Sequence, residues 1–305
     1  MPPHPPSVLR RNVAVSSRRA TAAWTGRLTA VLIVLAAVRG LLLLTQIPLV
    51  ALANNFDQVR YTACFDLYPH RPGIEPTMLN YQAPLERYAF QTVADQACYL
   101  TSDLAFQGAA VAIFHASERL GFEPLHSVRV VGALRLATWL LTAWLIGSAL
   151  LREGRDELAL AHGIWLATLA FDPVNTIYLP TFYAEPGVLY FAYLTVALVV
   201  LTVLRPTRMR IGLLALAATA LGLGKIQHLA LPLFLAATLA LAAWRERRLW
   251  PAAAALMLGA APALGTGIWQ LGRDTPFAQR LRLVNNADFV LTALLPASAE
   301  PARTA

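Results

Sequence analysis

The sequence predicts an all-α integral membrane protein, a polytopic bundle of about seven transmembrane helices with a helical first extracytoplasmic loop. Hydrophobic residues make up 57% of the 305 residues and charged residues only 14%, against about 25% charged in a soluble domain. Apolar runs of around twenty residues recur from Leu28 to Leu271, long enough to cross a hydrocarbon core of about 30 Å. Because a backbone inside lipid has to satisfy its own hydrogen bonds, we expect these runs to be helices.

The distribution of charge supports the same fold class. A net charge of +8 suggests a nucleic-acid partner, but 13 of the 24 arginines gather in four short segments, whereas 13 of the 17 acids lie in the other loops. The arginine segments lie at 10–27, 152–155, 205–210 and 245–248. This is the positive-inside pattern of a membrane protein. We therefore expect a multi-pass protein of the inner (cell) membrane with a cytoplasmic N-terminus and no nucleic-acid partner.

The N-terminal part divides into a tail and a first span. Residues 1–27 are rich in proline and arginine without an apolar period, so we expect a disordered, basic cytoplasmic tail. The first span runs over about 28–50. Residues 51–53 read Ala-Leu-Ala and imitate a signal-peptidase site, so a cleaved signal is the alternative. A signal peptide has an apolar region of about 7–15 residues, and this longer one favours a retained helix.

Residues 54–127 are expected to form the first outer loop. Within them, 103–120 is apolar for too short a stretch to span, follows Ser102 as a cap and stops at Gly121. We expect a helix lying on the membrane surface. Cys64 and Cys98 both fall in this loop, where they either form a disulfide or remain free thiols.

The rest of the transmembrane module, 28–271, consists of six further spans. They are expected at 128–151, 158–174, 186–204, 211–224, 226–244 and 249–271. Basic clusters on both sides of 211–244 require an even number of crossings, which places Lys225 at the outer apex of a hairpin. The segment 272–305 would be extracytoplasmic, and since no closing span follows it, we expect a fragment or a shortened relative of a larger protein.

Polar residues suited to chemistry collect on the predicted outer side. Asp57 lies just beyond the first span, and Asp172 and Glu185 bracket a short acidic loop. Ionisable residues at membrane depth are costly and are therefore functional candidates. Each carboxylate also has a structural alternative: Glu185 followed by Pro186 suits a helix start, Asp172 suits a turn, and Asp57 suits a solvated loop.

The hairpin apex combines Lys225 with Gln227 and His228. Lys225 is the single lysine of a chain that otherwise uses arginine, which suggests that a compact ammonium is needed, able to hold a phosphate as a point charge. The alternative is a lysine that snorkels to the interface, and for His228 it is a hydrogen-bonded structural residue.

Three arginines, Arg39, Arg129 and Arg135, fall within predicted spans. An arginine at the centre of a span costs about 2.5–3.5 kcal/mol unless it is paired or hydrated. We expect structural pairing for Arg39 and Arg135. Because six residues correspond to about 240° around a helix, Arg129 and Arg135 do not share a face. Acids of neighbouring helices or an anionic lipid headgroup are the partners considered for these arginines.

With these residues in view, the layout resembles the GT-C superfamily of membrane glycosyltransferases. An acid, Asp57, opens a long first outer loop, and that loop carries a surface helix at 103–120. A Tyr-x-Glu-Pro element at 183–186 opens a later span. The apex sequence Gly-Lys-Ile-Gln-His at 224–228 is similar to a segment of bacterial members of this group.

The resemblance implies transfer of a sugar from a polyprenyl-phosphate donor to a glycan or lipid acceptor at the outer membrane face. In this chemistry a base removes the proton of the acceptor hydroxyl, and cationic groups stabilise the departing phosphate. The resemblance makes Asp57 the base and Lys225 the phosphate ligand with a nearby arginine, while Glu185 orients the acceptor or binds a divalent metal ion. The site residues it implies are Asp57, Arg60, Tyr183, Glu185, Lys225, Gln227 and His228. The alternatives are a non-catalytic transporter or flippase of a lipid-linked or anionic solute, and a scaffold or degenerate fragment without activity.

Overall fold

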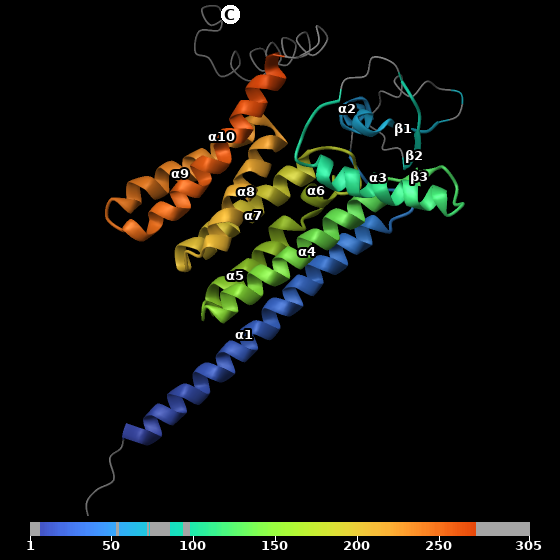
Figure 1. The fold of residues 1–305 in the computed structure, drawn as a ribbon. Helices are drawn as coiled ribbons and strands as arrows, with labels where there is room; N and C mark the ends of the chain where they lie inside the picture. The colour runs from blue at the N-terminus through green and yellow to red at the C-terminus, as the bar shows by residue number, and fades with distance from the viewer. Residues whose placement is uncertain (1–6, 53–54, 72, 74–85, 94–97, 273–305) are drawn as a thin grey trace, which may run out of the picture.

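The computed structural model describes residues 7–52, 55–71, 73, 86–93 and 98–272, and this part of the chain is mostly helical (Figure 1). The helices are α1 (Ser7–Leu44), α2 (Asn55–Thr62), α3 (Leu104–Arg119), α4 (Arg129–Arg152), α5 (Asp156–Trp165), α6 (Pro173–Thr176), α7 (Glu185–Leu204), α8 (Arg208–Gly224), α9 (Ala230–Ala243) and α10 (Trp250–Gly272). Single helical turns lie at η1 (Ala63–Phe65), η4 (Ile226–Leu229) and η5 (Arg247–Leu249), and a π-helical turn, η3 (Leu166–Ala170), continues α5. The predicted segment 272–305 lies outside the described residues except for its first residue.

Four helices of the described chain are long and apolar enough to cross a membrane. They cover Ala23–Leu44, Arg129–Arg152, Glu185–Leu204 and Arg247–Trp269. These four match predicted spans, so the prediction of a helical transmembrane protein is confirmed. The predicted spans at 158–174, 211–224 and 226–244 fold as α5 with η3, as α8 and as η4 with α9. These helices are shorter, and the total of about seven spans stays a prediction.

The prediction that residues 1–27 are disordered is wrong for residues 7–27. The first helix begins at Ser7 and continues without a break into the span. A helix that the apolar segment has already nucleated can extend at little cost, because only the first turn carries the nucleation penalty. Residues 1–6 lie outside the described part of the chain.

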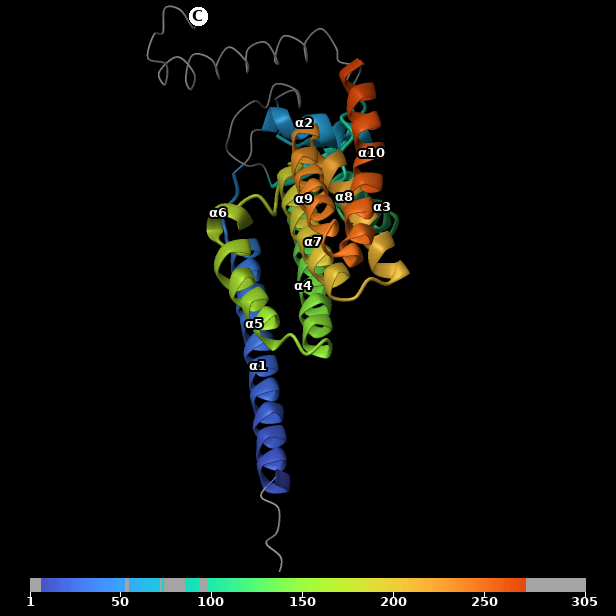
Figure 2. The same ribbon diagram turned by 90° about the vertical axis from the view of Figure 1, so that its left-hand side faces the viewer.

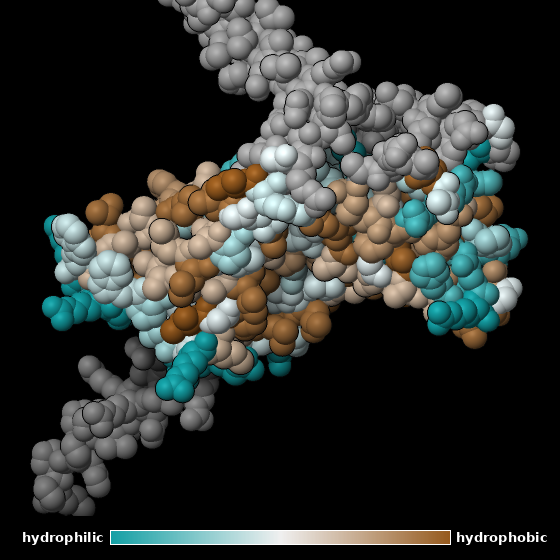
Figure 3. Space-filling model, turned by 45° about the horizontal axis from the view of Figure 1, so that its top comes forward, coloured by the Kyte–Doolittle hydropathy of each residue, from teal (hydrophilic) through white to brown (hydrophobic). Residues whose placement is uncertain are grey.

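The two ends of the bundle differ in composition. The connections α4–α5, α7–α8 and α9–α10 lie at one end, and α2, α3 and a small sheet lie at the other (Figures 1 and 2). We call these the arginine end and the α3 end. The arginine end contains Arg152, Arg155, Arg205, Arg208, Arg210, Arg245, Arg247 and Arg248. Between the ends, much of the described surface visible in Figure 3 is apolar, with hydrophilic residues gathered toward both ends. This is the surface expected of a protein that spans lipid.

The α3 end contains a sheet that the sequence did not predict. Strands β1 (Leu67–Pro69), β2 (Arg87–Phe90) and β3 (His126–Ser127) pair antiparallel in that order. The strands are too short to produce a readable alternation of apolar and polar residues. Cys64 and Cys98 form a disulfide, which resolves the two alternatives in favour of pairing.

The helix predicted at 103–120 is confirmed as α3, but its predicted start is wrong. Its position on the membrane surface stays a prediction. Ser102 does not cap it: the residue at the cap position is Asp103, whose side chain also makes no capping bond. The Asp103 carboxylate is used elsewhere, as described below. The predicted stop is confirmed, since Gly121 follows the helix with a positive φ of 84°, a conformation that suits glycine.

Two of the arginines in spans form contacts that join elements. Arg39 of α1 donates to the carbonyl of Ala167, which lies in the π-helical turn η3, where the regular hydrogen-bond ladder is shifted. Arg129, at the start of α4, donates from Nε to Glu86 at 2.7 Å and from Nη2 to the carbonyl of Gln46 at 2.6 Å. Structural pairing of Arg39 is therefore confirmed, with a backbone carbonyl instead of an acid as its partner.

Candidate functional site

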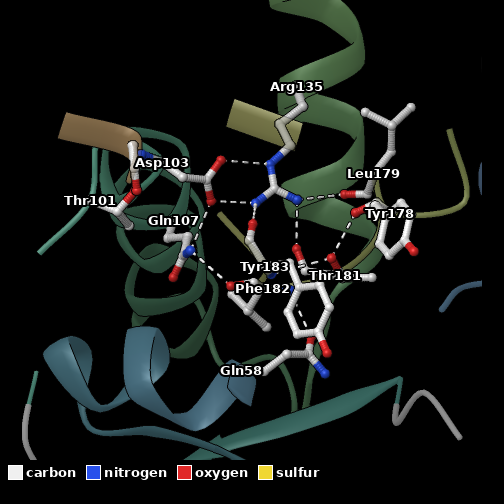
Figure 4. Close-up of polar contacts among 11 residues, drawn as sticks. Gln58, Thr101, Asp103, Gln107, Arg135, Tyr178, Leu179, Thr181, Phe182 and Tyr183 are labelled. Atoms are coloured by element: carbon white, nitrogen blue, oxygen red, sulfur yellow. Dashed lines mark hydrogen bonds and ion pairs between the residues drawn. The ribbon is translucent and has the colours of Figure 1, made fainter. Parts of the chain in front are cut away.

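A buried ion pair between Asp103 and Arg135 lies at the centre of the α3 end (Figure 4). The two side chains are 0% and 2% exposed, and Arg135 Nε donates to Oδ1 of Asp103 at 3.1 Å while Nη2 donates to Oδ2. Arginine suits such a position because its planar fork matches a carboxylate at two points. A buried charge of either sign is tolerated only when it is paired and fully hydrogen-bonded, so the two residues depend on each other.

Arg135 also binds the irregular chain that leads into α7. Its remaining N–H groups donate to the carbonyls of Leu179 at 2.7 Å, Thr181, and Tyr183 at 2.9 Å. With the two bonds to Asp103, these contacts use all five donors of the guanidinium. Residues 179–183 lie outside helices and strands, so no regular backbone ladder supplies donors for these carbonyls. The guanidinium of Arg135 supplies the donors instead. It thereby fixes the loop that ends at Glu185.

Two glutamines extend the network to α2 and α3. Gln107 Nε2 donates to Oδ2 of Asp103 at 2.8 Å and to the carbonyl of Phe182 at 3.1 Å. The amide N–H of Phe182 in turn donates to Oε1 of Gln58 at 2.7 Å. Burial raises the pKa of the Asp103 carboxyl, and the charge and hydrogen bonds of Arg135 and the hydrogen bond of Gln107 act in the opposite direction. Helices α2, α3 and α4 thus converge on one loop (Figure 4).

The absence of a side chain at Gly187 permits the close approach of Asp103 to α7. A Cβ atom at this position would lie 2.5 Å from Oδ1 and 2.8 Å from Cβ of Asp103. Such distances are far inside van der Waals contact, so only glycine fits in the first turn of α7 while Asp103 keeps its place.

Two predicted site residues, Glu185 and Lys225, meet beside this network. Lys225 Nζ donates to Oε1 of Glu185, and the two side chains are 30% and 44% exposed. Glu185 begins α7, with Pro186 in its first turn, so the predicted helix-start role and the pairing hold together. Lys225 sits in an extended conformation between α8 and η4, as expected of the apex of a hairpin. The pair is accessible, unlike Asp103 and Arg135.

The other predicted residues are arranged around this pair in different ways. The backbone N–H of His228 donates to the carbonyl of Lys225 at 2.9 Å. The half-buried imidazole of His228 lies within electrostatic range of Lys225 and Glu185. Gln227 is exposed. Tyr183 contributes its carbonyl to Arg135, and its ring stacks on Tyr178 with 6.1 Å between centroids.

Helix α2 carries the remaining two predicted residues. The carbonyl of Arg60 accepts from the backbone N–H of Tyr99 at 2.9 Å. The side chain of Arg60 is half-buried. Asp57 lies in α2 next to Gln58, which contacts the loop before Glu185; the side chain of Asp57 lies outside the described part of the chain. Asp172 has the structural role weighed for it, because its carboxylate accepts from the N–H of Val174 at 2.9 Å and caps α6.

Sequence reasoning missed the central role of Asp103 and the contact of Thr101 with the hairpin. Thr101 Oγ1 donates to the carbonyl of Gly224 at 3.0 Å. The available signal was Arg135 itself, for which we expected a partner. The sequence places Asp103 only within a predicted surface helix, and nothing in the sequence distinguishes it from the other acids of the loop.

A divalent metal ion was left open by the sequence. Among the described residues, no group of three or more His, Cys, Asp or Glu side chains is arranged to hold a metal ion. Glu185, the predicted ligand, instead contacts the ammonium of Lys225. The described residues therefore do not fit a metal ion.

The fold and the site together define a polytopic helical membrane domain with an accessible acid–ammonium pair at one end of its bundle. A family model described as the YfdI N-terminal transmembrane domain matches residues 16–305. Since the match covers most of the sequence, the chain belongs to this family. No curated protein and no solved structure matches the chain.

Proposed function

We propose that the protein is a membrane glycosyltransferase that moves a sugar from a polyprenyl-phosphate donor to a glycan or lipid acceptor at the α3 end of the bundle. The observation that carries the proposal is the contact between Glu185 and Lys225, which lie 40 residues apart in the sequence. The chain's family, the membrane domain of a glycosyltransferase-like protein, supports the same direction.

In this proposal the ammonium of Lys225 holds the donor phosphate. Its side chain is partly exposed at the end of two helices, where a membrane-anchored phosphate can reach it while its isoprenoid tail stays in lipid. The phosphate competes with Glu185 for Lys225, and its arrival frees a carboxylate to orient the acceptor hydroxyl. Tyr183, Gln227, His228 and Arg60 line the surroundings of the bound donor and acceptor.

The proposed reaction is an inverting displacement with Asp57 as its base. Asp57 removes the proton from the acceptor hydroxyl as its oxygen forms a bond to the anomeric carbon. The bond between that carbon and the phosphate oxygen breaks, and the polyprenyl phosphate leaves with the electron pair and is stabilised by Lys225. Support for Asp57 comes from the contact of the adjacent Gln58 with Phe182, three residues before Glu185.

The proposal also includes a topology of seven spans with the α3 end facing the outside. The short helices α5, α8 and α9 would then cross together with the four longer ones. Support comes from the arginines gathered at the opposite end of the bundle, which the positive-inside rule assigns to the cytoplasm. Arg210 Nη2 and Glu153 Oε1, 2.8 Å apart, join the first turn of α8 to the α4–α5 connection at that end.

An assay of the purified chain in liposomes with labelled polyprenyl-phosphate sugars tests the proposal. We expect Asp57→Asn to lose turnover by about 10²–10⁴-fold, the usual contribution of a general base, while the protein remains folded. Lys225→Ala should raise the KM for the donor. Thr238→Val, a change on an exposed face of α9, should leave both unchanged. Full activity of Asp57→Asn would remove it as the base, and an unchanged donor KM in Lys225→Ala would remove the phosphate site.

A further inference from the structure

One short segment, residues 101–103, touches both parts of the chain that carry the Glu185–Lys225 pair. On one side, the buried Thr101 donates from Oγ1 to the carbonyl of Gly224 at 3.0 Å. Gly224 is the last residue of α8 and immediately precedes Lys225. The last carbonyls of a helix have no partner inside the helix, and Thr101 supplies one at the point where the chain turns toward the hairpin apex.

On the other side, Asp103 reaches the chain that precedes Glu185. It holds Arg135 through two hydrogen bonds, and Arg135 donates to the carbonyl of Tyr183 at 2.9 Å. Asp103 also lies directly against the first turn of α7, since a Cβ atom at Gly187 would overlap it. Thr101 thus fixes the backbone at Lys225, and Asp103 fixes the backbone at Glu185.

Both members of the pair sit where regular structure is interrupted. Lys225 is extended between α8 and η4, and an irregular stretch precedes the start of α7 at Glu185. Helix packing alone does not set the position of such residues. An ion pair with side chains 30% and 44% exposed contributes little to holding them in place. The packing of α7 against α8 brings the two residues close together, since a Cβ atom at Gly224 would overlap Val188. The buried contacts beneath the pair hold the backbone on both sides of it.

We propose that Thr101 and Asp103 are positioning residues that hold Glu185 and Lys225 at contact distance. The segment that contains them is itself tied to α2: the disulfide Cys64–Cys98 lies just before it, and the N–H of Tyr99 donates to the carbonyl of Arg60 at 2.9 Å. Segment 101–103 therefore links the helix that carries Asp57 with the pair. Only the catalytic role of the Glu185–Lys225 pair rests on the proposed function; the positioning of the two side chains does not.

The single lysine of the chain makes the arrangement directly measurable. An amine-reactive acylating reagent modifies only Lys225 and the N-terminal amine, and mass spectrometry of the peptides gives both rates in the same molecule. Glu185→Gln removes the carboxylate and should raise the rate at Lys225, relative to the N-terminal amine, roughly two- to fivefold, the range of a partly exposed ion pair. Thr101→Val keeps the shape of the side chain but removes the donor, and should produce a comparable rise.

Rescue and control variants separate positioning from general destabilisation. Thr101→Ser keeps the hydroxyl and should restore the wild-type ratio, whereas Thr238→Val, whose hydroxyl donates only within α9, should not change it. If Thr101→Val does not fold, Thr101→Ala removes the same donor. An increase in Glu185→Gln together with an unchanged ratio in the folded Thr101 variant overturns the positioning role alone. An unchanged ratio in Glu185→Gln means that the pair does not form, and this outcome also removes the support for the proposed function.

Discussion

The dependence of Asp103 and Arg135 on each other can be tested by removing the two charges separately and together. Arg135→Met leaves the Asp103 carboxylate, which is 0% exposed, without its counter-charge and also leaves the carbonyls of Leu179, Thr181 and Tyr183 without their donor. Breaking one side of a buried pair costs about 3–5 kcal/mol. Each carbonyl left buried without a partner adds about 1–3 kcal/mol, unless water reaches it. We therefore expect the free energy of unfolding to fall by about 5 kcal/mol or more.

The double variant Asp103→Leu, Arg135→Met removes both charges and should recover part of this loss. Replacement of a whole buried pair by apolar residues is often neutral or stabilising, but the three carbonyls would still lack a donor. The double variant should therefore be more stable than Arg135→Met by about 2–4 kcal/mol and remain less stable than the wild type. Reversible unfolding in mixed detergent micelles with increasing SDS gives these free energies. If the losses of the two single variants simply add in the double variant, the two residues are independent and the reasoning is refuted.

Two further predictions concern a glycine and a carboxylate of the same end. Gly187→Ala should lower the free energy of unfolding by about 1–3 kcal/mol through overpacking against Asp103. The control Gly212→Ala, in α8 with nothing within 4 Å of its Cβ position, should be neutral or slightly stabilising. Equal effects of the two variants in the SDS titration would contradict the close contact. The hydrogen bond from Arg129 lowers the pKa of Glu86 below its usual 4.5, so its contribution to stability is present above this value and is lost as the pH falls through the lowered pKa. The difference in Tm between the wild type and Glu86→Gln should therefore be present at pH 7 and shrink below pH 4.5, and a difference independent of pH would argue against the ionised pair.

The long helices were predictable from the sequence because each is determined by the apolar run of its own residues. The predicted spans at 128–151, 186–204 and 249–271 agree with α4, α7 and α10 within one or two residues, since apolar length alone defines them. Less local features were not predictable. The strands of the small sheet are stabilised by pairing with chain segments up to 40 residues away, and their own sequences show no period.

The candidate site likewise has features that the sequence predicts and features that it does not. That Glu185 and Lys225 lie at the same end of the bundle follows from counting crossings and basic clusters. Their direct contact depends on how α7 packs against α8, which the sequence does not specify. For Arg135 the high cost of an unpaired charge in a span predicted a partner. The choice of Asp103, 32 residues earlier, depends on how the chain returns to α4 through α3 and β3.

The position of the polar network follows from the breaks in the helices. Where α8 ends at Gly224 and where α7 has yet to begin, backbone carbonyls are released from the helical ladder, and within a membrane protein each of them needs a protein partner or water. Thr101 and Arg135 fill this need from the side of the protein interior. Because the buried donors satisfy the backbone, the side chains of Lys225 and Glu185 at the same breaks are left to face outward. In the proposed topology, an interruption of two helices near one end of the bundle would place an ammonium and a carboxylate where water and lipid phosphates meet. Their charges would cost less there than at the centre of a span.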